Sequence, residues 1–64
     1  MVSLGKRLQE LRKRRNMTQE ALAAKTGLNR SYLARLEMGR HDPRLATAKK
    51  LAAALGVKID ALLR

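Results

Sequence analysis

Residues 18–37 constrain the fold of this chain more than any other stretch, because they predict two short helices joined by a tight turn. Thr18 can cap the first helix, since a threonine hydroxyl accepts a hydrogen bond from a free backbone N–H one turn on. Gly27 is expected to end that helix, because glycine enters the left-handed conformation without the steric cost of a Cβ. Asn29 can cap the second helix, expected at about residues 29–38. So short a connection predicts a helix-turn-helix arrangement.

Apolar residues at helical spacing predict three further helices, so the chain is expected to be all-α, with five helices. The first covers residues 3–15 and is capped by Ser3, and the last is a short helix at 59–63. Asp42 is expected to cap the fourth, with Pro43 in its first helical position, where the N–H would lack a partner anyway. The core-facing stripe of the fourth helix is predicted to consist of Leu45, Ala48, Leu51, Ala52 and Leu55. Twelve leucines and ten alanines, both strong helix formers, agree with an all-α fold.

The charge balance of the chain favours a polyanionic partner. Fifteen lysines and arginines stand against five acids, which gives a net charge of +10. Basic side chains that neutralise phosphates release condensed counterions, and this drives binding to nucleic acid without any sequence readout. The alternative at this point is a merely soluble basic protein.

Length and composition restrict the other classes of function. A chain of 64 residues is expected to form a single domain, residues 1–64. The longest wholly apolar run, 51–55, is far shorter than the roughly 20 residues of a membrane span. The absence of cysteine suits a cytoplasmic protein. One histidine and five scattered acids offer no metal-ligand or acid–base pairing, so we expect no enzyme, metal, cofactor or small-molecule ligand.

The second helix of the predicted pair has two unlike faces. One face is apolar and carries Tyr32, Leu33 and Leu36. The opposite face carries groups that can bond base edges or touch a thymine methyl group: Arg30, Ser31, Ala34, Arg35 and Met38. The alternative is an ordinary solvated helix face, since charged outer faces are the norm.

A set of residues in the predicted helix pair stands at one known spacing: Gln19, Ala23, Gly27, Leu33 and Leu36. The flanking stretches LRKRRNMTQEALA, RLEMGR and LAAALGV, together with Pro43, extend the pattern over about residues 4–63. In these features the chain resembles the phage repressor and Cro helix-turn-helix family, the Xre-like regulators. The resemblance implies a compact five-helix fold, with the helix-turn-helix at helices 2 and 3. It also implies DNA binding as a dimer at operator sites.

The resemblance assigns roles to individual residues. It implies contacts to base edges from Arg30, Ser31 and Arg35, and contacts to DNA phosphates from Gln19, Asn29, Arg40 and Arg44. It also implies a largely buried salt bridge between Arg12 and Glu37, which would link the first helix to the end of the third. For Asn29, capping of the helix remains an alternative to a phosphate contact.

Two residues of the predicted second helix, at about 29–38, depart from the family pattern. Met38 stands where many relatives have a polar or basic residue that contacts a phosphate, so this contact is either missing or apolar. Tyr32 stands where relatives often have a small or aliphatic residue. Its ring either packs at the edge of the core with a solvated hydroxyl, or it places that hydroxyl on a phosphate.

These observations predict a sequence-specific, double-stranded-DNA-binding transcriptional regulator. By analogy with the family we expect a repressor that binds a palindromic operator as a homodimer, with the recognition helix in the major groove. The alternative is an antitoxin-like module, or another module that binds a protein partner, since such proteins reuse this fold.

Overall fold

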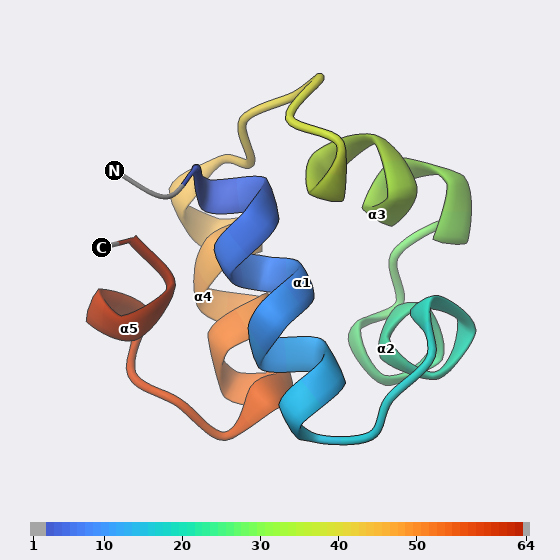
Figure 1. Cartoon of the computed structure of the whole chain (residues 1–64), viewed down its shortest axis with the longest axis horizontal. Helices are drawn as coiled ribbons and strands as arrows, with labels where there is room; N and C mark the ends of the chain where they lie inside the picture. Colours follow the sequence, from blue (N-terminus) through green and yellow to red (C-terminus); the bar gives the residue numbers. More distant parts are fainter. Residues whose placement is uncertain (1–2, 64) are drawn as a thin grey trace.

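Five α-helices account for most of residues 3–63, the part of the chain that the computed structural model describes. They are α1 (Leu4–Arg14), α2 (Gln19–Thr26), α3 (Arg30–Glu37), α4 (Leu45–Leu55) and α5 (Ile59–Leu63). Helix α1 lies across the front of the molecule in Figure 1, with α2 and α3 to one side of it and α5 to the other. Helix α3 packs against both α1 and α2, and α5 packs against α1 and α4. No β-strand occurs within the described residues, so the prediction of an all-α fold with five helices is confirmed.

Side-chain caps begin the first three helices, as predicted. The Ser3 hydroxyl accepts a hydrogen bond from the Lys6 N–H at 3.2 Å, and the Thr18 hydroxyl accepts one from the Ala21 N–H at 3.0 Å. Asn29 caps α3 in the same way. Each cap provides an acceptor for an N–H that has no partner inside the helix. These three local signals therefore fix where α1, α2 and α3 begin.

The turn between α2 and α3 consists of three residues. Gly27 ends α2 in the left-handed conformation, with φ +75°, where a side chain would be strained. Leu28 follows, and its N–H donates both to the Ala23 carbonyl at 3.1 Å and to the Thr26 hydroxyl at 3.3 Å. Asn29 is then already the cap of the next helix. The turn is thus closed by backbone and side-chain bonds, and it sets α3 directly against α2.

The core consists of leucine and alanine side chains from all five helices. Leu8, Leu22, Leu33, Leu51 and Leu62 are almost completely buried, one from each helix. The remaining buried apolar residues are Leu11, Ala23, Leu36, Ala48, Ala52 and Leu55. At roughly 25 cal/mol per Å² of buried apolar surface, these side chains supply most of the drive to fold.

The start of α4 differs from the prediction. The helix begins at Leu45, and its N-cap is Arg44, whose extended backbone (ψ 158°) cannot belong to the helix. Asp42 and Pro43 therefore lie in the loop, and no side chain caps α4. Leu45, predicted to be buried, is 60% exposed because it stands in the first turn, ahead of the core-facing stripe. The helix thus begins two residues after Pro43, the predicted first helical position.

Helix α1 approaches the end of α3 closely at Gly5. A Cβ at this position would meet the Leu36 and Glu37 carbonyl oxygens, so only glycine fits. The next turn of α1 contributes Leu8 to the hydrophobic core. Gly5 thereby sets how near the last turn of α3 lies to α1.

Candidate DNA-binding face

The two faces of α3 differ in burial as predicted. Leu33 is 0% and Leu36 2% exposed, so this side of the helix is fully engaged in the core. On the opposite side Arg30, Ser31 and Arg35 are exposed, as is Met38 just beyond the helix end. None of the four side chains forms a hydrogen bond or ion pair within residues 3–63. The polar groups of Arg30, Ser31 and Arg35 are therefore free to bind a ligand.

Asn29 has a structural role at the first turn of α3. Its Oδ1 accepts a hydrogen bond from the Ser31 N–H at 2.7 Å. This uses the oxygen of the amide and leaves its NH₂ group, which is a donor, pointing to no partner among the described residues. Capping and a contact to a phosphate are therefore compatible in this one side chain.

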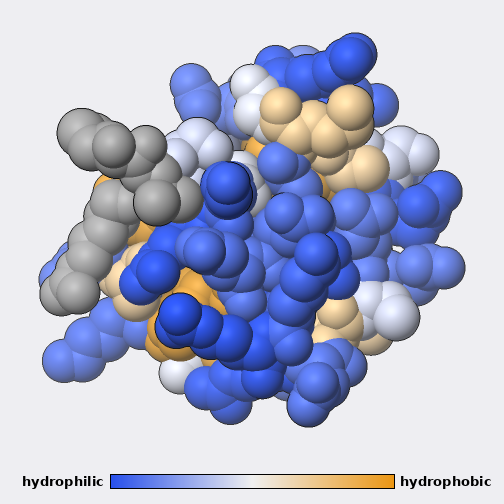
Figure 2. Space-filling view, in the orientation of Figure 1, coloured by the Kyte–Doolittle hydropathy of each residue, from blue (hydrophilic) through white to orange (hydrophobic). Residues whose placement is uncertain are grey.

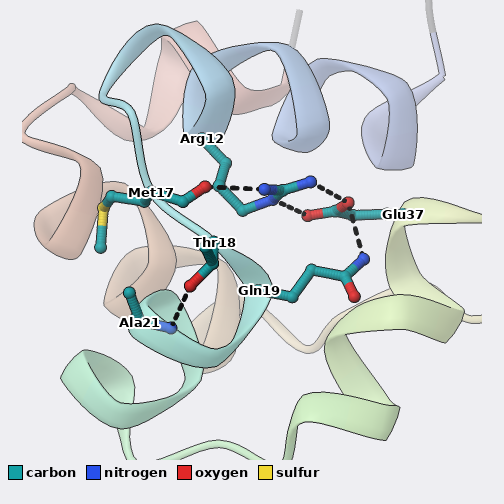
Figure 3. A network of polar contacts seen from close by, with 6 residues as sticks. All are labelled: Arg12, Met17, Thr18, Gln19, Ala21 and Glu37. Atoms are coloured by element: carbon teal, nitrogen blue, oxygen red, sulfur yellow. Dashed lines mark hydrogen bonds and ion pairs between the residues drawn. The ribbon is translucent and has the colours of Figure 1, made fainter.

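An ion pair between Arg12 and Glu37 lies between α1 and the end of α3 (Figure 3). Arg12 Nε and Glu37 Oε2 are 2.7 Å apart, and a second bond joins the Arg12 NH2 nitrogen to Oε1 at 3.0 Å. The two side chains are only 10% and 2% exposed, respectively. Such two-pronged pairing fixes geometry as well as charge. The pair connects α1 to the last residue of α3, as the family resemblance implies.

Two further bonds extend this pair into a network (Figure 3). The third donor of Arg12, NH1, reaches the Met17 carbonyl at 2.7 Å, just ahead of α2. The Gln19 amide, on the first residue of α2, donates to Glu37 Oε1 at 3.1 Å. Glu37 therefore binds groups from both α1 and α2 while it belongs to α3. The network fixes the orientation of α3 relative to its two neighbours, and Gln19 acts in it as a brace.

The loop after α3 carries two exposed arginines, Arg40 and Arg44. Gly39, with φ +78°, ends α3 and allows the Arg40 N–H to bond the Arg35 carbonyl at 3.0 Å, which places Arg40 beside the end of α3. Arg44 is the N-cap residue of α4, where the first N–H groups of the helix have no side-chain partner. Free N–H groups at a helix start favour an anion.

Arg7 of α1 and Arg15, the C-cap residue of that helix, have structural contacts that were not predicted from the sequence. Arg7 Nε donates to the Ala61 carbonyl at 2.9 Å, and the Arg15 NH2 nitrogen donates to the Gly56 carbonyl at 3.3 Å. These carbonyls belong to α5 and to the end of α4, far away in the sequence. No local sequence pattern predicts such contacts, because no residue near Arg7 or Arg15 in the sequence specifies the partner.

Hydrophilic side chains cover most of the face of the molecule that carries α1 (Figure 2). Among the described residues, no three histidine, cysteine or acidic side chains come together in a way that could hold a metal ion. None of the helices in the described range is long and apolar enough to cross a membrane.

The arrangement of α2, α3 and their turn is found in known proteins. The model of the helix-turn-helix family HTH_3 matches residues 8–62. The chain belongs to this family. The predicted family, the Xre-like helix-turn-helix regulators, is therefore confirmed.

Three relatives of this HTH_3 chain illustrate the likeness. The immunity repressor protein of Bacillus phage phi105 is 43% identical over 61 residues, which cover 95% of this chain and 42% of the phage protein. The structure of the restriction-modification controller protein C.AhdI from Aeromonas hydrophila has 40% identity and a TM-score of 0.90, covering 94% of this chain and 91% of that one. SinR, a master regulator for biofilm formation solved in complex with DNA, has 31% identity and a TM-score of 0.91, covering 95% and 98%. The chain thus spans less than half of the phage repressor's length.

Proposed function

We propose that this chain is a sequence-specific regulator of transcription that binds double-stranded DNA in the cytoplasm and acts as a repressor. The observation that carries the proposal is the exposed stripe of Arg30, Ser31 and Arg35 on a helix whose other side is locked into the core. An α-helix fits the major groove of DNA, and in helix-turn-helix proteins the second helix of the motif enters it. The SinR structure, solved with DNA, has the same fold.

Base readout in this proposal comes from the exposed side of α3. The forked guanidinium groups of Arg30 and Arg35 can each bond O6 and N7 of a guanine, and a good pair of this kind contributes about 1–3 kcal/mol of discrimination. Ser31 lies between them in the sequence, and its hydroxyl both donates and accepts, so it adapts to any base. Arg30 and Arg35 therefore carry most of the sequence preference.

Phosphate contacts in this proposal come from four residues around α3: Gln19, Asn29, Arg40 and Arg44. Each of the two amides has an N–H left over after its bond inside the protein. Both arginines are exposed and form no ion pair within the described residues. Contacts to the backbone fix register and orientation and carry no sequence information of their own.

A palindromic operator requires two copies of this chain. In helix-turn-helix dimers the half-sites lie one helical turn, about 34 Å, apart. The described part of the chain contains one helix-turn-helix, α2 and α3, so one copy can present α3 to one half-site. We therefore propose a homodimer on DNA.

Selection of binding sites from a random duplex library tests the proposal. At ~150 mM salt non-specific binding has a Kd of only about 10⁻⁴–10⁻⁶ M, so enrichment reports sequence readout. We expect a palindromic consensus with guanines in each half-site. Salt-dependent binding without any enrichment would refute sequence readout, and no binding even at low salt would favour a module that binds a protein partner.

A further inference from the structure

Met38 is the most exposed large apolar side chain in residues 3–63, at 64% exposed. It belongs neither to the hydrophobic core nor to the partly buried apolar side chains packed against that core. Its backbone still follows the helix, because the Met38 N–H donates to the Ala34 carbonyl, four residues back, at 3.0 Å. Packing of the protein therefore gives no reason for an apolar side chain of this size at the end of α3.

Helix geometry places Met38 within the exposed stripe of α3. Successive residues of an α-helix are turned by about 100°, so Arg30 and Arg35 stand about 140° apart around the axis, and Met38 lies between them, about 80° from Arg30. Ala34 and Arg35 are its neighbours on the helix surface, since they stand four and three residues before it. Ala34 is partly exposed. Met38 and Ala34 thus form an apolar spot between two guanidinium groups.

The major groove of DNA offers an apolar group that matches such a spot. Base pairs present hydrogen-bond donors and acceptors there, and thymine adds its C5 methyl group. 5-Methylcytosine carries a methyl group at the same ring position. The unbranched chain and polarisable sulfur of methionine adapt to irregular apolar surfaces. Its thioether has no N–H or O–H to donate, so a phosphate is not a partner for Met38.

We propose that Met38 is a specificity-determining residue that contacts a pyrimidine 5-methyl group in the major groove. Because Met38 neighbours Arg35 on α3, this methyl group lies close to the guanine that Arg35 binds. Arg30 and Arg35 select guanines by hydrogen bonds, and Met38 selects a methyl-bearing pyrimidine by apolar contact. The inference rests on the proposed function and adds to it a readout that does not depend on hydrogen bonds.

Replacing the thymines of the selected duplex by deoxyuridine, one at a time, tests the proposal, because deoxyuridine lacks only the methyl group. At one thymine in each half-site we expect the replacement to weaken binding of the wild type about fourfold, as for one methyl group left out of an apolar contact. Met38→Ala should bind the unmodified duplex several-fold more weakly. Deoxyuridine should cause no further loss in this variant, since both changes remove the same contact.

Met38→Leu is the matched control, because leucine keeps an apolar side chain of similar volume. This variant should retain the loss on deoxyuridine. Both variants should unfold at the wild-type urea midpoint, since Met38 lies outside the core. They should also keep the wild-type dependence of affinity on salt, because neither change removes a phosphate contact.

A second replacement identifies which pyrimidine carries the methyl group. A loss on deoxyuridine that depends on Met38 identifies thymine. A gain in affinity when a cytosine of the half-site is replaced by 5-methylcytosine, again dependent on Met38 and without a loss at any thymine, identifies 5-methylcytosine. Either result supports the proposed contact.

Two results would overturn this inference while leaving the proposed function intact. The first is a wild-type affinity that neither replacement changes, which would show that no methyl group is read. The second is an equal response of Met38→Ala and the wild type, which would show that another side chain contacts the methyl group. If site selection yields no enrichment, sequence readout itself is refuted and this inference fails with it.

Discussion

Each side chain of α3 either packs in the protein or is exposed to solvent, and at residue scale the consequences of substitution divide accordingly. Glu37 illustrates the first case, because its carboxylate is 2% exposed and binds both Arg12 and Gln19. Arg35 illustrates the second, because it is exposed and has no partner among the described residues. Changes at Glu37 should therefore act on stability, and changes at Arg35 on DNA readout.

Glu37→Ala is expected to lower the free energy of unfolding by about 3–5 kcal/mol, because it leaves the Arg12 guanidinium buried without its carboxylate. Urea unfolding followed by circular dichroism measures the change. Glu10→Ala is the matched control, since Glu10 meets Arg7 at 3.8 Å and its side chain is 43% exposed. Exposed pairs of this kind contribute little, so this variant should unfold close to the wild type. Equal unfolding midpoints for the two variants would contradict the role of the Arg12–Glu37 pair.

Arg35→Ala and Arg40→Ala should weaken DNA binding in different ways. Arg35→Ala removes a base contact, so it should cost about 1–3 kcal/mol on the preferred site and relax the preference at one or two base pairs. Arg40→Ala removes a phosphate contact, so it should weaken all sequences alike and reduce the salt slope by about one. Titration of the selected site and of random duplexes separates the two patterns. Parallel losses on both duplexes for Arg35→Ala would argue against base readout.

At the scale of the elements, the start of α3 combines a structural and a proposed functional role in Asn29. Asn29→Ala removes the cap and should cost about 1 kcal/mol of stability. Asn29→Asp keeps an equally good cap but places a carboxylate where a phosphate is proposed, so it should preserve stability and weaken DNA binding. Thermal unfolding and a duplex titration of the two variants check both halves. Undiminished DNA affinity in Asn29→Asp would remove Asn29 from the set of phosphate contacts.

The contact between α1 and α3 at Gly5 gives a second prediction at this scale. Glycine to alanine within a helix usually stabilises by about 1 kcal/mol. Here the added Cβ meets the backbone carbonyls of Leu36 and Glu37, so Gly5→Ala should instead destabilise by about 1–3 kcal/mol. Lys6→Ala, at the exposed next position, is the control for helix propensity alone. A higher unfolding temperature for Gly5→Ala than for the wild type would show that α1 can shift away from these carbonyls without a loss of stability.

The helices also show which structural features can be predicted from local sequence signals and which cannot. Caps are read from one or two residues, so the starts of α1, α2 and α3 were predictable at Ser3, Thr18 and Asn29. Contacts between distant segments were not, as Arg7 with the Ala61 carbonyl shows. The start of α4 was mispredicted, because Asp42 and Pro43 form a good local start signal and yet the helix begins only after Arg44. The Arg12–Glu37 pair was anticipated only through the family resemblance.

At the scale of the whole molecule, the number of recognition helices gives a prediction about stoichiometry. The described residues contain one helix-turn-helix, α2 and α3, whereas a palindrome has two half-sites about 34 Å apart. A duplex with one half-site should therefore bind one copy, and a duplex with the full palindrome should bind two. Sedimentation of the complexes measures both ratios. One copy on the full palindrome at saturation would contradict the proposed homodimer.

The exposed stripe of α3 also bears on how such a protein can diverge. Arg30, Ser31 and Arg35 have no side-chain partner within the described residues. The groups that orient the helix belong to the network of Arg12 and Glu37, where α3 meets α1 and α2. Surface substitutions away from such networks usually change stability by less than about 0.5 kcal/mol. Mutation can therefore exchange the recognised sequence one position at a time, without an unstable intermediate. A lineage built on this scaffold can acquire new target sites while its folding remains under separate selection.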